Sequence, residues 1–150
     1  VCSSDLRMAL AHRYDAVIAA IRATVPTASI LVLGPPDMAQ RRAGKRCENA
    51  KAFPLDPATG LPPEDCQWHT PALLNQIIDV QRAAALRNGV AFFDTQRAMG
   101  GPEQMAGFVT ADPKLAFGDH VHFTKLGYQR WGELLLRELL ANYSTVPSGK

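Results

Sequence analysis

The sequence predicts an α/β domain in which helices pack on a small parallel sheet. Two stretches with apolar residues at helical spacing, Met8 to Val25 and Thr70 to Arg87, alternate with two continuous apolar runs, Ser29 to Leu33 and Val90 to Phe93. Short runs that are apolar throughout and end at a turn signal are typical of strands buried in a parallel sheet. Helices that alternate with such strands favour a layered α/β architecture.

The first predicted helix ends at Pro26, because proline cannot continue a helix. Its apolar residues recur at the spacing of one helical face, namely Leu10, Tyr14, Val17, Ile18 and Ile21. The strand that follows stops at Gly34-Pro35-Pro36. A second helix is expected from Thr70, which would act as N-cap with Pro71 in the first turn, to a stop at Asn88-Gly89.

After the second strand we expect a short helix, a loop and a final helix capped by Thr124. Along one side of this last helix lie Tyr128, Trp131, Leu135 and Leu139. The Met99-Gly100-Gly101 segment is interpreted as a turn that needs positive φ, with pocket lining as the alternative. Trp68, Tyr128 and Trp131 are expected to be core or groove aromatics rather than a sugar platform.

Composition sets broad bounds on function. The chain has 150 residues, of which 47% are hydrophobic and 20% charged, as expected for one globular domain. A net charge of +2 gives no electrostatic reason to expect nucleic acid, and the basic cluster Arg41-Arg42 with Lys45-Arg46 is interpreted as solvating a loop. No run approaches the ~18 apolar residues of a membrane span. Composition leaves the oligomeric state open.

The most informative motif is Gly118-Asp119-His120-Val121-His122-Phe123-Thr124-Lys125-Leu126-Gly127-Tyr128. Asp119 lies three residues before His122, on a short loop that opens into the last helix. At this spacing the carboxylate can turn back to the imidazole Nδ1–H, fix its tautomer and stabilise the imidazolium that forms when Nε2 takes a proton. The motif therefore predicts an acid–histidine pair.

This D-x-x-H followed by F-T-x-x-G-Y resembles the last conserved block of the SGNH/GDSL hydrolases, a family of serine esterases and lipases. The resemblance implies a three-layer, flavodoxin-like fold with a parallel sheet flanked by helices, and it carries over Asp119 and His122 as catalytic residues. It implies an ester substrate, either a small molecule or a glycan, and no cofactor or metal. The family's nucleophilic serine, in a G-D-S motif, and its oxyanion Gly and Asn belong to earlier blocks that have no match in this sequence.

The absence of these blocks leads us to expect an N-terminally truncated domain. Residues 1–6 resemble a translated sequencing adapter and are interpreted as a non-native segment, residues 7–143 as the C-terminal portion of a single hydrolase domain, and residues 144–150 as a flexible tail. Ser3 and Ser4 are not expected to be nucleophiles, because no strand precedes them to form a nucleophile-bearing turn.

The segment from Asp37 to His69 shows no sustained periodicity and is expected to be an irregular excursion. It either shapes the acyl or alcohol pocket or is a surface insertion without substrate contact. Cys47 and Cys66 lie inside it, and they would form a loop-closing disulfide if the protein is exported. If they are bridged, a periplasmic or secreted location is slightly favoured.

Three further residues have two interpretations each. His120 and His122 form H-x-H, which on a strand would put two metal ligands on one face, but His120 is expected to be a rim residue because no third ligand is recognisable. Asp37 either approaches the substrate or initiates a turn after its strand, and we favour the turn. Asp94 either shapes the site or caps the following turn.

Three functions remain open from the sequence. The leading one is a serine esterase that removes acetyl-type acyl groups, plausibly from carbohydrate or cell-wall glycan. The second is a metal-binding hydrolase centred on His120 and His122. The third is a non-catalytic domain that keeps the fold of the family.

Overall fold

A computed structural model describes residues 3–42, 47 and 55–143. Residues 1–2 of the predicted non-native segment, Lys45 and Arg46 of the basic cluster, and the predicted tail 144–150 lie outside the described residues. The elements are α1 (Ser3–Thr24), β1 (Leu31–Leu33), η3 (Glu64–Cys66), α2 (Ala72–Arg87), β2 (Ala91–Phe93), α3 (Thr95–Ala98), α4 (Met105–Thr110) and α5 (Lys125–Tyr143).

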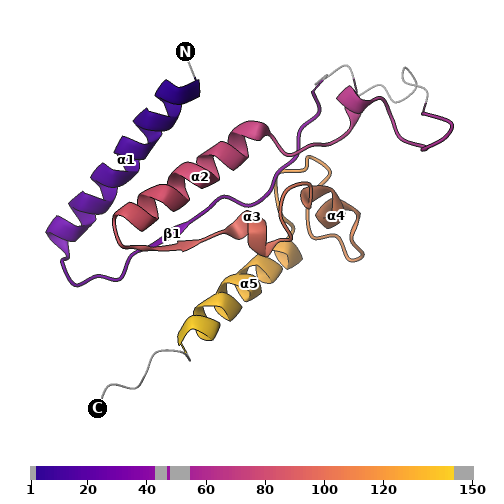
Figure 1. Ribbon diagram of the computed structural model, residues 1–150. Helices are drawn as coiled ribbons and strands as arrows, with labels where there is room; N and C mark the ends of the chain where they lie inside the picture. Colours follow the sequence, from indigo (N-terminus) through magenta and orange to yellow (C-terminus); the bar gives the residue numbers. More distant parts are fainter. Residues whose placement is uncertain (1–2, 43–46, 48–54, 144–150) are drawn as a thin grey trace.

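The predicted α/β architecture is confirmed. Strands β1 and β2 pair in parallel, with Leu31 opposite Ala91 and Leu33 opposite Phe93. Helix α2 lies on one side of the strand pair and α5 on the other, while α1 runs beside α2 (Figure 1). The carboxyl ends of both strands therefore point toward the loops that carry the candidate site, as expected for an open parallel sheet.

Polar contacts fix α1 against α2. Asn88, at the C-terminal end of α2, donates a 2.6 Å hydrogen bond to Oδ1 of Asp15 in α1, and Arg87 forms an ion pair with the same carboxylate. Gln81 of α2 donates to the hydroxyl of Tyr14, and Ile18 is buried beside them. The predicted apolar face of α1 is only partly covered, because Val17 and Ile21 remain exposed among the described residues.

The main core joins the last residue of β2 to α4, α5 and the loop that carries Asp119 and His122. Its buried members are Ala39, Phe93, Met99, Met105, Ala116, Phe123 and Leu134. Two of them, Ala116 and Phe123, form an isolated antiparallel bridge that closes the base of this loop. The core therefore holds both ends of the loop in place.

Several element boundaries differ from the expected ones. Helix α1 begins at Ser3 rather than Met8, because the intervening residues contain no helix breaker and Asp5 suits the positive end of the helix dipole. Both strands are three residues long. Helix α4 was not expected, since its six residues are too few to show a helical period. No helix in the described ranges is long and apolar enough to span a membrane.

Of the three caps and turns expected at Thr124, Gly100-Gly101 and Thr70, two are present. Thr124 caps α5, since its hydroxyl accepts a 3.2 Å hydrogen bond from the backbone N–H of Gly127. Gly100 and Gly101 have φ values of 119° and 101°, so the predicted turn with positive φ is confirmed. The expected capping role of Thr70 is wrong, because no side chain caps α2 and the Thr70 hydroxyl instead donates to Asp37.

Candidate active site

The loop between Ala116 and Phe123 is a tight turn with its own hydrogen bonds. The backbone N–H of Phe117 donates to the carbonyl of His122 at 2.9 Å, and the N–H of His120 donates to the carbonyl of Phe117 at 3.1 Å. His120 lies at the tip with a φ of 60°, which turns the chain back on itself. The turn brings Asp119 and His122 to the same side of the loop.

The predicted contact between these two residues is present. Oδ2 of Asp119 lies 2.7 Å from Nδ1 of His122. The other carboxylate oxygen, Oδ1, accepts hydrogen bonds from the backbone N–H groups of Val121 at 3.0 Å and His122 at 3.1 Å. The hydrogen bond from the His122 ring, followed by these two backbone donors, lowers the pKa of Asp119 from 3.8 to about 2. Asp119 is therefore ionised at neutral pH and orients the ring of His122.

The outer side of the His122 ring is open. The side chains of His122 and Asp119 are 69% and 49% exposed, and Nε2 of His122 has no hydrogen-bond partner among the described residues. With Nδ1 held as the donor to Asp119, Nε2 is left as the basic nitrogen. The pair can therefore accept a proton at Nε2 from a group that approaches from solvent.

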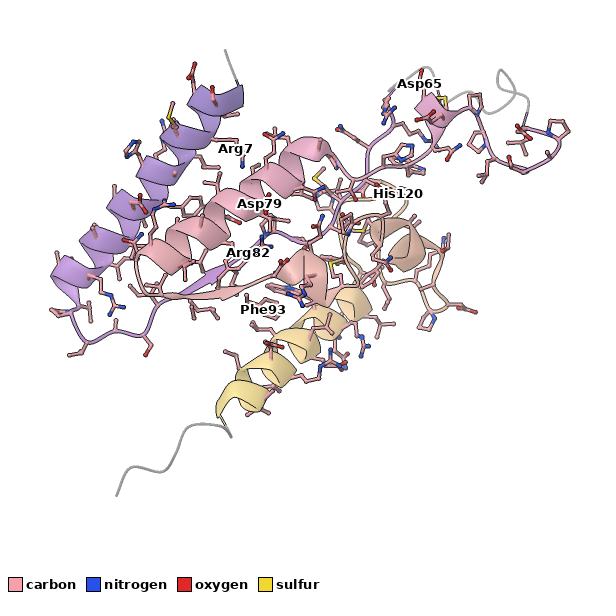
Figure 2. The ribbon with its side chains drawn as sticks, viewed as in Figure 1. Arg7, Asp65, Asp79, Arg82, Phe93 and His120 are labelled. Atoms are coloured by element: carbon pink, nitrogen blue, oxygen red, sulfur yellow. A yellow bond between two sulfur atoms is a disulfide. The ribbon has the colours of Figure 1, made fainter. Side chains whose placement is uncertain are left out.

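His120 has a different environment from His122. It is 7% exposed, and its ring stacks on Trp68 with the centroids 3.6 Å apart and the planes inclined by 15°. Nδ1 lies 3.0 Å from the carbonyl oxygen of Gly118, and burial lowers the pKa of the ring. The expectation that His120 is a rim residue is therefore wrong, because its ring is buried against Trp68. His120 is labelled in Figure 2, close to α4.

The two histidines of the H-x-H motif do not share a face as metal ligands would on a strand. One ring contacts Asp119 and the other Gly118 and Trp68. Within the described residues no three His, Cys, Asp or Glu side chains are grouped so that they could hold a metal ion.

Asp37 is a buried structural acceptor. Its side chain is fully buried, and it accepts hydrogen bonds from Thr70, Gln96 and the backbone of Met105. The favoured interpretation of Asp37 as a turn initiator is wrong. The sequence carries no local sign of this role, because the donors lie far from Asp37 in the chain.

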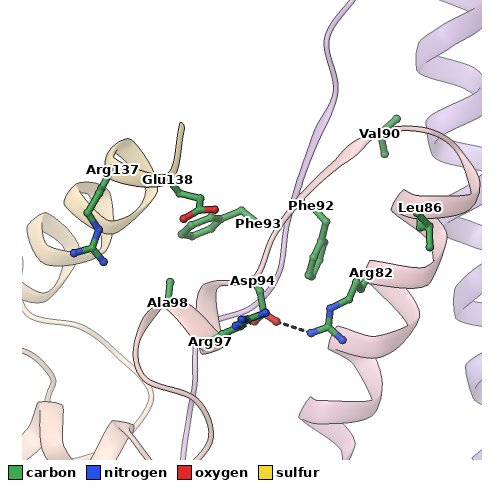
Figure 3. A pocket seen from close by; sticks show the side chains of 10 residues that line it. All are labelled: Arg82, Leu86, Val90, Phe92, Phe93, Asp94, Arg97, Ala98, Arg137 and Glu138. Carbon is green, nitrogen blue, oxygen red and sulfur yellow. Dashed lines mark hydrogen bonds and ion pairs between the residues drawn. The ribbon is translucent and has the colours of Figure 1, made fainter. Parts of the chain in front are cut away.

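Asp94 has the second of its two predicted roles. Its Oδ1 accepts a 3.0 Å hydrogen bond from the backbone N–H of Arg97 at the start of α3, and its Oδ2 pairs with Arg82. Asp94 and Arg82 both line a pocket of about 760 Å³ between α2, β2, α3 and α5 (Figure 3). Neither Asp119 nor His122 lines this pocket, so the pocket is separate from the acid–histidine pair.

The excursion after β1 is tied back to the loop of the acid–histidine pair. Cys47 and Cys66 form a disulfide, and Gln40 pairs with His69 in an isolated antiparallel bridge. The backbone N–H of Ala39 donates a 3.0 Å hydrogen bond to the carbonyl of His120. The two ends of this segment, at Ala39 and His69, therefore lie next to the loop of the acid–histidine pair.

Comparison with known proteins places the chain in a class of hydrolases. Residues 3–130 match the GDSL-like lipase/acylhydrolase family, so the chain belongs to this family and the predicted resemblance is confirmed. No curated protein matches the sequence. The structure is similar to a solved structure entitled "Peptidoglycan O-acetylesterase in action, 5 min", with a TM-score of 0.69 and 22% sequence identity. The match covers 97% of this chain and 34% of that one, so the chain spans about a third of its length.

Proposed function

We propose that Asp119 and His122 are the acid–base pair of a serine esterase that removes acetyl-type groups from hydroxyls of carbohydrate or cell-wall glycan. The observation that carries this proposal is the 2.7 Å contact between Asp119 Oδ2 and His122 Nδ1, with Nε2 open to solvent. Membership of the GDSL-like family supports ester hydrolysis. The similarity to a protein described as a peptidoglycan O-acetylesterase supports a glycan substrate.

In this mechanism His122 Nε2 takes the proton of a serine hydroxyl as the oxygen attacks the ester carbonyl. Asp119 stabilises the imidazolium that forms, without accepting the proton itself. His122 then protonates the departing alcohol, and a water activated in the same way hydrolyses the acyl-enzyme. The 150 residues contain no Gly-Asp-Ser triplet, and the proposal assigns the nucleophile to such a serine outside them.

The disulfide between Cys47 and Cys66 supports an oxidising compartment, such as the periplasm or the cell exterior. A cell-wall substrate would be met in the same compartment. We therefore place the proposed reaction outside the cytoplasm.

The test uses the full-length product of the gene and measures acetate release from O-acetylated peptidoglycan and from nitrophenyl acetate. His122→Ala should lower kcat by roughly 10³-fold or more, and Asp119→Ala should lower it less, because Asp119 orients the ring but exchanges no proton. His12→Ala, on the exposed surface of α1, is the matched control and should retain activity. A serine-directed organophosphonate should abolish turnover.

Two outcomes would support other functions. Activity that falls with a chelator and survives the organophosphonate would favour the metal-binding hydrolase. A full-length protein with no hydrolysis of any acyl ester, and no dependence on His122, would favour a non-catalytic domain of the family.

A further inference from the structure

The outer edge of β2 carries backbone groups that have no partner in the described part of the chain. The N–H of Ala91 donates to the carbonyl of Ile30 at 3.1 Å. The carbonyl of Phe93 accepts from the N–H of Gly34 at 2.8 Å. Because alternate residues of a parallel strand bond to the same neighbour, Phe92 turns its N–H and C=O away from β1. Such an edge is a template for pairing with another extended chain.

This edge opens into the 760 Å³ pocket. The pocket is lined by Val90, Phe92, Phe93 and Asp94 but by no residue of β1, so it lies on the outer side of β2. Figure 3 shows the side chain of Phe92 directed toward α2 and that of Phe93 directed toward α5. The strand edge is therefore recessed between two helices. A single extended segment can enter such a recess, whereas the β2 edge of a second copy would bring its own α2 and α5 against these helices.

The charged groups of the pocket favour an acidic partner. Its lining holds three guanidiniums, those of Arg82, Arg97 and Arg137, against two carboxylates, those of Asp94 and Glu138. Arg82 already pairs with Asp94. Arg97 on α3 and Arg137 on α5 are exposed, and neither forms an ion pair within the described ranges. Two such guanidiniums beside one strand edge are complementary to carboxylates carried by a pairing strand.

We propose that the outer edge of β2 is a docking site for an extended, acidic segment of a partner protein. The backbone of the segment pairs with the N–H and C=O of Phe92, and its carboxylates pair with Arg97 and Arg137. In strand addition of this kind the main-chain hydrogen bonds supply affinity and the neighbouring side chains supply specificity. The site does not include Asp119 or His122, so docking leaves the acid–histidine pair free.

The test is a binding measurement on the full-length product of the gene and needs no turnover. The probe is a fluorescein-labelled peptide of seven alternating valine and glutamate residues, because valine favours the extended conformation. Fluorescence anisotropy should show saturable binding below about 1 mM. The same peptide with lysine in place of glutamate should bind roughly tenfold more weakly or worse, because it places like charges beside the arginines.

Matched variants test the two arginines. The double variant Arg97→Ala/Arg137→Ala should weaken binding of the acidic peptide roughly tenfold, the scale of two partly exposed ion pairs. Arg7→Ala/Arg13→Ala removes two positive charges from the exposed surface of α1, outside the pocket, and should leave the affinity unchanged. All four side chains are exposed, so both double variants should fold.

A second arm tests the backbone pairing. Hydrogen exchange, resolved to single residues by mass spectrometry with electron-transfer fragmentation, should slow at the amide of Phe92 when the peptide is bound. The amide of Ala91 already donates to Ile30 and should change little. Unchanged exchange at Phe92 in the complex, or displacement of the peptide by an equal concentration of glutarate, would show a site for small anions only and overturn the proposal. Equal affinity for the two peptides, equal effects of the two double variants, or no saturable binding would also overturn it.

Discussion

The hydroxyl of Thr70 donates a 2.7 Å hydrogen bond to Oδ1 of Asp37, whose side chain is fully buried. Gln96 donates to the same oxygen at 3.2 Å, and the backbone N–H of Met105 donates to Oδ2 at 2.9 Å. A buried carboxylate is tolerated only when such donors replace the water it has lost. Through these hydrogen bonds, Asp37 links the segment after β1 to the starts of α2, α3 and α4.

Removal of this acceptor should destabilise the fold. We expect Asp37→Ala to lower the free energy of unfolding by about 2–4 kcal/mol, because three donors lose their acceptor inside the protein. Thr70→Val removes one donor and should cost about 1–2 kcal/mol. Urea unfolding followed by circular dichroism measures both. The control is Thr24→Val, which loses only an exposed hydrogen bond within α1. If Asp37→Ala were as stable as this control, the structural role of Asp37 would be contradicted.

The lowered pKa of Asp119 gives a prediction about pH. Its pKa in the folded state, about 2, lies below the ordinary value of 3.8. Its contribution to stability is therefore fully present above pH 3.8 and is lost as the pH falls toward 2. An NMR titration of the Asp119 carboxyl carbon should show a midpoint near 2.

The same titration distinguishes the effect of the His122 ring on the pKa of Asp119 from the effect of the backbone donors. In His122→Ala the midpoint of Asp119 should rise toward 3.8 without reaching it, since the backbone N–H groups at positions 121 and 122 still donate. His12→Ala, which changes a histidine on α1, should leave the midpoint unchanged. Identical midpoints in the unchanged protein and His122→Ala would show that the ring does not hold the carboxylate in solution.

Gly127 should be sensitive to the smallest possible side chain. A Cβ at this position would lie 1.8 Å from the carbonyl oxygen of Leu115, an overlap that only a backbone shift could relieve. Gly127→Ala should therefore lower the free energy of unfolding by at least about 1–3 kcal/mol. Gly132 lies on the same helix with open space around it, so Gly132→Ala should be neutral or stabilise by up to about 1 kcal/mol. Thermal unfolding of both variants checks this contrast. A Gly127→Ala variant as stable as Gly132→Ala would contradict it.

The 150-residue chain by itself should show no serine-esterase turnover. If the nucleophile lies outside these residues, as proposed above, Asp119 and His122 supply a base but no covalent carrier. Hydrolysis of nitrophenyl acetate by the chain should equal that of its His122→Ala variant. Turnover that requires both His122 and Ser4 would instead identify a nucleophile near the N-terminus.

What the sequence predicted depends on how local each signal is. Helix α2, the two strands and the cap at Thr124 follow from periodicity and turn residues, and the Asp119–His122 contact follows from a three-residue spacing. The pairing of Thr70 with Asp37 could not be found in this way, since both residues also suit turns and caps. The burial of His120 is hard to predict for a similar reason. Its burial depends on Trp68, which reaches it from a segment about 50 residues earlier.

The hydrogen bonds of Asp37 also bear on the order of folding. They join residues separated by 33, 59 and 68 positions, so they form only after long stretches of chain have been brought together. The contact between Asp119 and His122 spans three positions and closes almost no loop. We therefore expect the contact between Asp119 and His122 to form early in folding. The long-range contacts of Asp37, which position the surrounding segments, are expected to form late. A variant that slows this late step would carry the intact pair on a loop without its final orientation.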